Sequence, residues 1–399
     1  MKIAVIGGVA AGTSAAAKAR RENKEAEIVL FERDEDISYA GCGLPYYISG
    51  VVENREKVVI NTAEEFGEKY NVDLRTLHEV IDIDKENKKL KYKDLNSSKT
   101  DEYNYDKLII TTGASPIMPL IPGHELENIL PLRTVGDADR IKEVLANKDI
   151  NKATIVGAGL IGLEMAESFK ESDLEVTVIE KLPHVLPIIS DDMSELVENH
   201  LKENGVNLVT GDGVKEFVGN KEVKKVITEN GKEIESDLVL MSIGVKANVE
   251  LAKKAGIEIG ETGAIAVNEK METSAKDIYA AGDCAESKDL ITDKAAWVPL
   301  GSTANKQGRT AGENATGGNY RHKGILKTGI TKVFDLTVAR TGLLEAEAEE
   351  NGFEVEKVKI KAPDHAGYYP DAKPLEIEAI FDKESNKIIG ATVIGENGA

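Results

Sequence analysis

One pattern occurs twice in this chain: a short β-branched strand, a glycine-rich turn, a helix of small residues and a second strand that ends in an acid. The first copy runs from KIAVIGGVAAG to EIVLFE, and the second runs from KATIVGAGLIG to EVTVIE. Their first glycines, Gly7 and Gly157, are too far apart for the stacked units of a solenoid. The pattern therefore predicts two separate Rossmann-like α/β domains, each with a dinucleotide site.

The second copy matches the dinucleotide-binding motif G-x-G-x-x-G in full, with Gly157, Gly159 and Gly162. The first glycine permits the tight turn, the second lets the backbone approach a pyrophosphate, and the third allows helix and strand to pack closely. Glu180 ends the next strand, where a carboxylate accepts hydrogen bonds from a ribose diol and repels a 2′-phosphate. We therefore expect NADH here, and Lys181 beside the acid keeps NADPH as a second option.

The first copy departs from the motif because Val9 replaces the middle glycine. The strand that begins at residue 2, and Glu32 at the end of EIVLFE, nevertheless favour a second dinucleotide site. Two sites in one chain suit electron transfer between a resident cofactor and one that visits. Asp283, in IYAAGD, is placed to bind a sugar-like polyol, and a helix-capping aspartate is an equal alternative.

Cys42 lies between Gly41 and Gly43 in ISYAGCGLPYYISG, and Pro45 prevents a helix from continuing unbroken through this turn. A free cysteine is commonly a buried packing residue. The loop position and the small neighbours favour a reactive thiol here. Cys284, the other cysteine, ends an apolar strand and is expected to be structural. A lone active thiol holds oxidising equivalents as a mixed disulfide, a persulfide or a sulfenic acid.

The composition excludes several classes of function. A net charge of −20 argues against a non-specific nucleic-acid partner. No apolar run approaches the roughly 20 residues that span a bilayer, and two glycines interrupt the N-terminal stretch that resembles a signal peptide. Hydrophobic content of 41% with only two cysteines is typical of a soluble cytoplasmic protein. No metal site is predicted.

Strand-like segments followed by Gly and Pro mark the domain boundaries. KLIITTGASPIMPLIPG predicts a crossover near residue 115, and DLVLMSIGVKAN predicts a return near residue 245. From about residue 325 the sequence alternates as an antiparallel sheet does. We expect a discontinuous first domain at 1–114 and 245–324, a second at 115–244 and a third at 325–399.

These motifs together resemble the single-cysteine branch of the pyridine nucleotide-disulfide oxidoreductases, over essentially the whole chain. That branch contains coenzyme A-disulfide reductases, NADH oxidases, NADH peroxidases and persulfide or polysulfide reductases. The motifs are GGVAAG with Glu32, SYAGCGLPYY around Cys42, TTGA at 111–114, GAGLIG with Glu180, IYAAGD ending at Asp283, ANKQGR at 304–309, KVFDLTVARTGL at 332–343 and HAGYYP at 365–370.

The resemblance implies FAD on the first domain, NAD(P)H on the second, and a C-terminal α+β dimerisation domain in a homodimer. Relatives continue past the KIIGATVIG strand, so we expect the third domain to be incomplete. By the same resemblance, the FAD site comprises Gly7, Gly12, Glu32, Arg33, Val80, Thr112, Gly113, Arg133 and Asp283. The nicotinamide nucleotide site comprises Gly157, Gly159, Gly162, Glu180 and Gly244.

Residue 10 helps to place the chain within this branch. The oxidases and peroxidases carry a histidine there, whereas Ala10 exchanges no proton. The Leu-Pro-Tyr sequence after Cys42, and HAGYYP, also resemble the coenzyme A-disulfide and persulfide reductases. In that subgroup a tyrosine from the third domain faces the partner subunit's active site. Tyr368 and Tyr369 are the candidates, with an ordinary aromatic pair as the alternative.

The segment AAAKARR places Lys18 and Arg21 on one helical face, with Ser14 one turn earlier. In the coenzyme A-disulfide reductases this face, with the serine corresponding to Ser38, receives the phosphorylated coenzyme A; a solvated helix end is the alternative. We therefore expect an enzyme that passes hydride from NAD(P)H through FAD to Cys42 and reduces coenzyme A disulfide, coenzyme A persulfide or polysulfide. A water-forming NADH oxidase and a flavin/thiol redox sensor stay open as alternatives.

Overall fold

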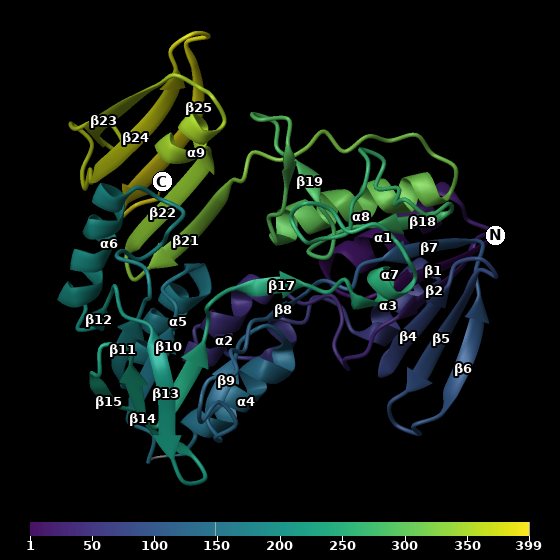
Figure 1. The fold of residues 1–399 in the computed structure, drawn as a ribbon, viewed down its shortest axis with the longest axis horizontal. Coiled ribbons are helices and arrows are strands. Elements are labelled where there is room, and N and C mark those ends of the chain that lie inside the picture. The colour runs from purple at the N-terminus through teal and green to yellow at the C-terminus, as the bar shows by residue number, and fades with distance from the viewer. Residues whose placement is uncertain (148, 399) are drawn as a thin grey trace. The chain divides into compact units, whose positions relative to one another are not determined.

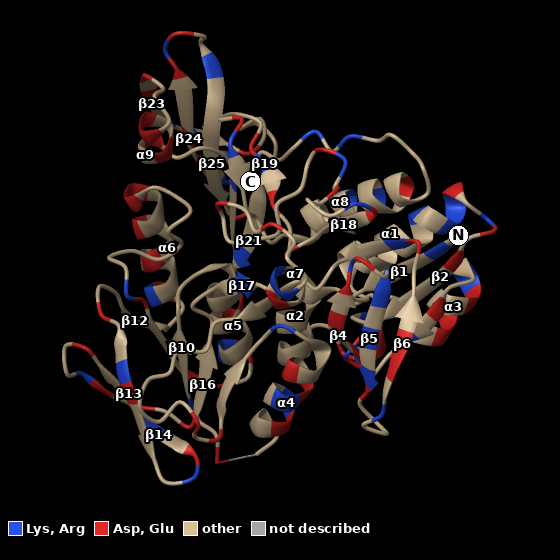
Figure 2. Ribbon diagram, turned by 45° about the vertical axis from the view of Figure 1, so that its right-hand side comes forward, with Lys and Arg blue, Asp and Glu red and all other residues tan. Residues whose placement is uncertain are grey.

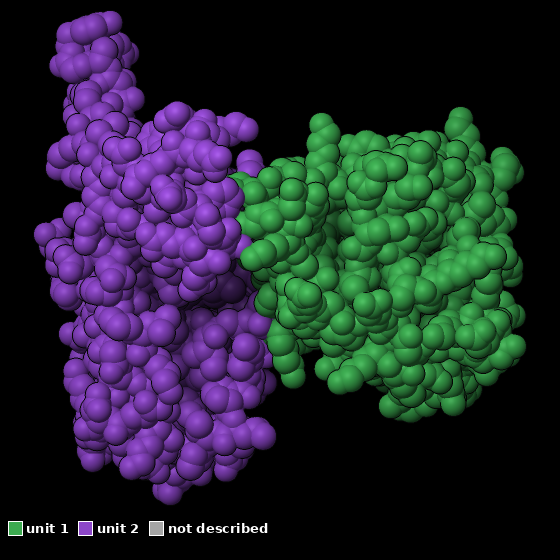
Figure 3. Space-filling view, turned by 45° about the horizontal axis from the view of Figure 1, so that its top comes forward, with its two compact units in different colours: residues 1–41, 55–115, 246–325 green, residues 42–54, 116–245, 326–399 purple. Residues whose placement is uncertain are grey.

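The computed structural model describes residues 1–147 and 149–398, which form two compact units (Figure 3). Unit 1 comprises residues 1–41, 55–115 and 246–325, and unit 2 comprises residues 42–54, 116–245 and 326–399. Unit 2 contains both segments that we expect to be the second and third domains. The division into three domains therefore stays a prediction.

Unit 1 is built on a parallel sheet with the strand order β18-β7-β1-β2-β3 (Figure 1). Apart from their first residues, β1 and β2 are buried throughout, as expected for parallel strands that are covered on both faces. Because β1 pairs with both β2 and β7, the Gly7 turn leaves the sheet from its central strand. The strands are β1 (Lys2–Ile6), β2 (Glu27–Phe31), β3 (Asp73–Arg75), β7 (Lys107–Ile110) and β18 (Ile278–Ala280).

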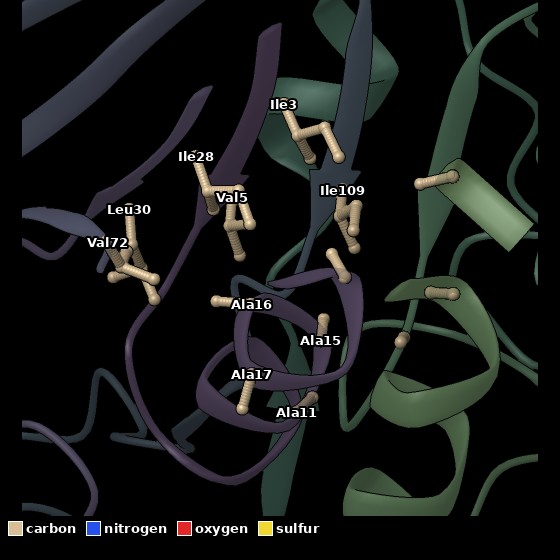
Figure 4. Close-up of a cluster of buried hydrophobic side chains, with 14 of the residues drawn as sticks. Ile3, Val5, Ala11, Ala15, Ala16, Ala17, Ile28, Leu30, Val72 and Ile109 are labelled. Carbon is tan, nitrogen blue, oxygen red and sulfur yellow. The ribbon is translucent and has the colours of Figure 1, made fainter. Parts of the chain in front are cut away.

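Helices α1 (Ala10–Glu22) and α8 (Gly301–Ala315) pack side by side in unit 1. Figure 4 shows the small side chains of α1 beside the apolar side chains of the sheet. The two helices approach closely because α8 presents glycines: a Cβ on Gly308 would lie 2.2 Å from the Ala11 carbonyl oxygen. The run of small residues near the N-terminus is thus interior helix.

An antiparallel sheet, β4-β5-β6, packs against the other side of the parallel sheet. Its lysine-bearing β5 lies between the acid-bearing β4 and β6 (Figure 2), so the alternating segment HEVIDIDKENKKLKYK forms charged antiparallel strands. These strands are β4 (His78–Asp84), β5 (Lys89–Asp94) and β6 (Thr100–Asn104). The remaining elements of unit 1 are α3 (Ala63–Tyr70), α7 (Glu250–Lys254), β19 (Ser287–Lys288), β20 (Ala295–Ala296) and the 3₁₀ turn η2 (Arg55–Lys57).

Unit 2 repeats this arrangement, with a parallel sheet in the order β12-β11-β10-β16-β9 and an antiparallel sheet β13-β14-β15. Strand β10 occupies the place of β1, and β11 that of β2. The duplicated sequence pattern therefore corresponds to a duplicated fold, which confirms the prediction of two Rossmann-like domains. The strands are β9 (Ile129–Pro131), β10 (Lys152–Val156), β11 (Glu175–Ile179), β12 (Asn207–Val209), β13 (Val214–Gly219), β14 (Val223–Thr228), β15 (Glu233–Glu235) and β16 (Leu238–Met241). The helices are α2 (Leu44–Ser49), α4 (Val135–Leu145), α5 (Leu160–Glu171) and α6 (Asp191–Glu203).

The C-terminal segment of unit 2 forms an antiparallel sheet with the order β21-β22-β25-β24-β23. Its elements are β21 (Gly329–Val333), β22 (Leu336–Gly342), α9 (Glu345–Glu350), β23 (Val355–Pro363), β24 (Pro374–Asp382) and β25 (Lys387–Gly395). Two short strands, β8 (Ala114–Pro116) and β17 (Val245–Ala247), pair where the chain passes between the units. Among the described residues, no helix has the length and apolar character needed to cross a membrane.

Candidate active site

The first glycine of each dinucleotide turn is required by the backbone. Gly7 has a φ of +99° and Gly157 has a φ of +102°, a region that residues with a side chain rarely adopt. A Cβ would lie 2.2 Å from the Thr111 carbonyl oxygen in the first turn and 2.6 Å from the Ser242 carbonyl oxygen in the second. Each turn therefore passes tightly over the neighbouring strand end.

The third and middle glycines have different roles. A Cβ on Gly12 or Gly162 would lie 1.8 or 2.0 Å from the carbonyl oxygen of the first glycine, so helix and turn could not pack as they do. At the middle position Val9 and Gly159 have φ values of −97° and −80°, which any residue adopts. Within the described residues nothing lies within 4 Å of a Cβ built on Gly159. Glycine at the middle position thus leaves room for a ligand, and valine fits the first turn without strain.

Unit 1 holds an acid at the first turn in the way that a ribose site requires. Glu32 is buried after β2, and its carboxylate accepts hydrogen bonds from the Gly8 N–H at 2.6 Å and the Asp34 N–H at 3.0 Å. Burial raises the pKa of this carboxyl, and the two N–H donors oppose the rise. Among the described residues, no side chain caps the N-terminus of α1 and no acid lies in its first turn, so its N–H groups suit a pyrophosphate.

Most of the other residues that we expected at the FAD site also lie in unit 1. Thr112 and Gly113 follow β7, Asp283 follows β18, Arg33 follows Glu32, and Val80 is buried on β4. The Thr112 hydroxyl donates to the Asn248 carbonyl oxygen at 2.7 Å, and the Asp283 carbonyl accepts from the Trp297 indole at 2.8 Å. Arg133 instead belongs to unit 2. The strand ends of unit 1 fit FAD by the shape of the turn and its acid.

Unit 2 repeats the arrangement at its own turn. Glu180, also buried, accepts from the Ala158 N–H at 2.7 Å and the Leu182 N–H at 2.9 Å. Gly244 follows β16 with a φ of +111°. The turn, its acid and the uncapped start of α5 fit a nicotinamide dinucleotide.

Cys42 lies in the 3₁₀ turn η1 (Gly41–Gly43), directly before α2, and is exposed. Two hydrogen bonds fix α2 within unit 2. The Ser168 hydroxyl of α5 donates to the Pro45 carbonyl oxygen at 2.9 Å, and the Tyr47 hydroxyl donates to Asp139 of α4 at 2.9 Å. The thiol is therefore held at the start of a short helix that is anchored to two others.

The protein groups around Cys42 favour its thiol over its thiolate. Although its surface is accessible, neighbouring protein atoms partly desolvate the thiol, and this is the main cause that raises the pKa of Cys42. The negative charge of Glu164 on α5 raises this pKa further, while the positive charge of Arg133 opposes the rise. Glu164 is not among the site residues predicted from the sequence. The sequence signal for it is an acid within the apolar helical segment GLIGLEMAES, because burying an unpaired charge costs free energy.

Cys284 is fully buried, as expected for a structural residue. Its Sγ–H points to the Ala281 and Ile110 carbonyl oxygens at 3.4 and 3.5 Å. Cys42 is thus the accessible thiol of the two.

Comparisons with known proteins support this geometry. The family model described as pyridine nucleotide-disulphide oxidoreductase matches residues 1–308, and the model of the family's dimerisation domain matches residues 328–399. The chain belongs to this family. It is an oxidoreductase whose cofactors are FAD and NAD(P)H.

The named relatives include both NADH oxidases and enzymes that reduce sulfur compounds. An NADH oxidase of Methanocaldococcus jannaschii is 38% identical over 99% of this chain and 88% of the relative. An NAD(P)H coenzyme A polysulfide/persulfide reductase of Pyrococcus horikoshii is 37% identical over 99% of this chain and 88% of the relative. The solved structure of an NAD-dependent persulfide reductase from A. fulgidus superposes with a TM-score of 0.96, at 42% identity, over 99% of this chain and 74% of that one.

The basic face that we expected at α1 of this oxidoreductase is partly neutralised. Lys18 lies 2.5 Å from Glu22 on its own helix and 3.0 Å from Glu313 on α8. Arg21 is exposed. An anionic substrate would therefore have to draw Lys18 away from two carboxylates. Ser14 lies on the same helix, and Ser38 lies in unit 1 with a φ of +49°.

Tyr368 and Tyr369 lie in the loop between β23 and β24, with exposed fractions of 92% and 65%. The ring of Tyr369 packs edge-on against His365 at 5.4 Å, and its N–H donates to the Ala366 carbonyl oxygen at 2.8 Å. Tyr368 is therefore the more available of the two for a contact outside this chain.

Proposed function

We propose that this protein uses NADH to reduce coenzyme A disulfide, coenzyme A persulfide or polysulfide, with Cys42 as its redox thiol. The observation that carries the proposal is a single exposed thiol directly before an anchored helix, in a chain with two dinucleotide turns. Bound FAD would supply the two-electron chemistry between nicotinamide and sulfur. The Cys42 thiolate attacks the substrate sulfur and forms a mixed disulfide or persulfide, while the coenzyme A thiolate or, from polysulfide, a shorter polysulfide leaves.

The site residues have matching roles in this proposal. Glu32 and Glu180 orient the ribose groups of FAD and NADH, and the first and third glycines shape the two turns. Arg21 and Lys18 attract the phosphates of coenzyme A, and Tyr368 from a second subunit assists the leaving thiolate. The polysulfide/persulfide reductase of P. horikoshii and the persulfide reductase of A. fulgidus are similar over nearly the whole chain, which supports this assignment.

A water-forming NADH oxidase is the second candidate, because the M. jannaschii relative is named an NADH oxidase at comparable identity. Ala10, the first residue of α1, argues against it, since a methyl group gives no hydrogen bond to a sulfenic acid. A redox sensor with slow turnover is the third.

A panel of acceptors tests the proposal on the FAD-loaded protein. We expect NADH oxidation to require coenzyme A disulfide, coenzyme A persulfide or polysulfide, and to be at least about tenfold slower in air alone, a difference of about 1.4 kcal/mol in barrier. Rapid oxidation in air without a sulfur acceptor would instead identify an oxidase. A single stoichiometric reduction would identify a sensor.

We also propose that the protein is a cytoplasmic homodimer. The match to a dimerisation domain supports this, as does an apolar row across all five strands of the C-terminal sheet. The row is partly exposed, as a surface that becomes buried in an interface would be. In register it comprises Ile330, Ala339, Val393, Ile377 and Ile360. Light scattering should give twice the mass of one chain.

Replacement of Glu180 by alanine should move the nucleotide preference toward NADPH. The carboxylate that would repel the 2′-phosphate is removed, while Lys181 remains beside the site. We expect the ratio of kcat/KM for NADH to that for NADPH to fall at least about tenfold, or about 1.4 kcal/mol. Glu175→Ala, an exposed acid at the start of the same strand, is the matched control. An unchanged ratio in Glu180→Ala would remove Glu180 from the ribose site.

A further inference from the structure

Two carboxyl groups lie one turn apart on α5 with unlike partners. Glu167 pairs with the Lys332 ammonium of β21 at 2.5 Å and accepts from the Phe334 N–H at 2.9 Å. Glu164 accepts from a neutral donor, the Thr331 hydroxyl, at 2.9 Å. A carboxylate beside a neutral donor is stabilised less than one in an ion pair. The two carboxyl groups therefore differ in their partner on β21, which is a neutral hydroxyl for Glu164 and a positively charged ammonium for Glu167.

The pKa of the Glu164 carboxyl is shifted upward. Burial, and the neighbouring charge of Glu167, raise its pKa to about 7, against the lowering effect of the Thr331 hydrogen bond. A carboxyl with such a pKa gains and loses a proton in the pH range where enzymes of this kind work. Glu164 is thus suited to exchange a proton, whereas Glu167 serves to hold Lys332.

Glu164 acts on the redox thiol through a fixed arrangement. The hydroxyl of Ser168, one turn further along α5, donates to the Pro45 carbonyl oxygen at the start of α2, so the segment directly after Cys42 is fixed to the helix that carries Glu164. Burial is the main cause that raises the pKa of Cys42 and of Tyr46, which lies on the other side of Pro45, and the charge of Glu164 raises both further. Among the described residues, Arg133 lowers the pKa of Cys42, Glu167 raises the pKa of Glu164, and Lys332 lowers the pKa of Tyr46.

We propose that Glu164 takes up a proton as Cys42 loses one, so that the pair carries one negative charge in either state. The Sγ–H bond breaks, an O–H bond forms on the Glu164 carboxyl, and the negative charge moves from oxygen to sulfur without any electron transfer. Two adjacent negative charges in a partly buried site are thereby avoided. The proton held on Glu164 is then available to the thiolate that the substrate expels.

This proposal rests on Cys42 being the redox thiol of the proposed function, but its test follows thiol ionisation rather than turnover. The rate of alkylation of Cys42 by iodoacetamide is measured against pH on the FAD-loaded protein. Cys42→Ser gives the background, since Cys284 is buried. Glu164→Gln removes the charge at nearly constant shape, and Glu171→Gln, an exposed acid at the end of α5, is the matched control.

In Glu164→Gln we expect the midpoint of the alkylation curve to move to lower pH by at least about half a unit, because a nearby negative charge has been removed. Glu171→Gln should leave the midpoint unchanged. Thr331→Val removes the donor that favours ionised Glu164, so it should produce a smaller shift in the same direction. It serves as the second variant if Glu164→Gln does not fold.

An unchanged midpoint in Glu164→Gln, or a shift to higher pH, would overturn the proposal. The outcome is separate from that of the acceptor panel. If no sulfur acceptor is reduced but the midpoint shifts, the proposed function is wrong and the coupling of Glu164 to Cys42 stands. If sulfur is reduced and the midpoint does not shift, the coupling is wrong and the function stands.

Discussion

Cys42→Ser should abolish sulfur reduction while NADH still reduces the flavin. A serine hydroxyl forms neither a mixed disulfide nor a persulfide. Residue 42 would then carry no sulfur species that could accept electrons from the flavin. We expect turnover with coenzyme A disulfide or polysulfide to fall at least about a thousandfold, as for removal of other catalytic nucleophiles. Steady-state NADH consumption measures this loss, and rapid-mixing flavin absorbance measures the step that should persist.

The other cysteine supplies the control for this experiment. Cys284 is fully buried, and a serine there could donate its one hydroxyl proton to either of the two carbonyl oxygens that now face Sγ. Cys284→Ser should therefore keep the turnover of the unmodified enzyme to within about twofold, since substitutions that preserve local bonding have small effects. Full sulfur-reducing turnover in Cys42→Ser would refute the assignment of the redox thiol.

The parallel sheets of both units were predictable because their signals are local. A buried β-branched strand, a glycine with positive φ and an acid at the end of the next strand occur within one short stretch, and each has a reason in its own backbone. Gly7 and Gly157 show this, since each combines positive φ with a close approach to a strand end. Even the departure at Val9 is explained by a φ of −97°, which needs no glycine.

The arrangement around Cys42 could not be predicted because its members are distant in sequence. Glu164 and Thr331 reach the thiol region only through the packing of α2 and β21 on α5. Part of the neutralisation of Lys18 has the same origin, because Glu313 lies on α8, which packs against α1 although it is distant in the sequence, whereas Glu22 is on the same helix as Lys18. Helical spacing shows which charges share a face, but it does not show what a second helix places opposite them.

The second dinucleotide turn offers a test that separates folding from binding. Gly157→Ala should lower both the stability of the protein and its affinity for NADH. Alanine at a φ of +102° costs about 1–3 kcal/mol in strain, and its Cβ would lie 2.6 Å from the Ser242 carbonyl oxygen. We expect the melting temperature to fall by at least about 4 °C and NADH affinity to fall at least about tenfold. FAD content should be retained, since the turn proposed for FAD lies in unit 1.

Gly159→Ala should lower the affinity for NADH and leave the stability of the protein unchanged. Its φ of −80° suits alanine, and within the described residues nothing lies within 4 Å of the added Cβ, so the melting temperature should not change. The same methyl group would occupy the space through which a pyrophosphate approaches the backbone. We therefore expect NADH affinity to fall about tenfold, read from the NADH dependence of flavin reduction. If Gly159→Ala bound NADH normally, the pyrophosphate would not lie against this turn, and the glycine motif would be structural. The two alanines thus distinguish a glycine that the fold requires from one that the ligand requires.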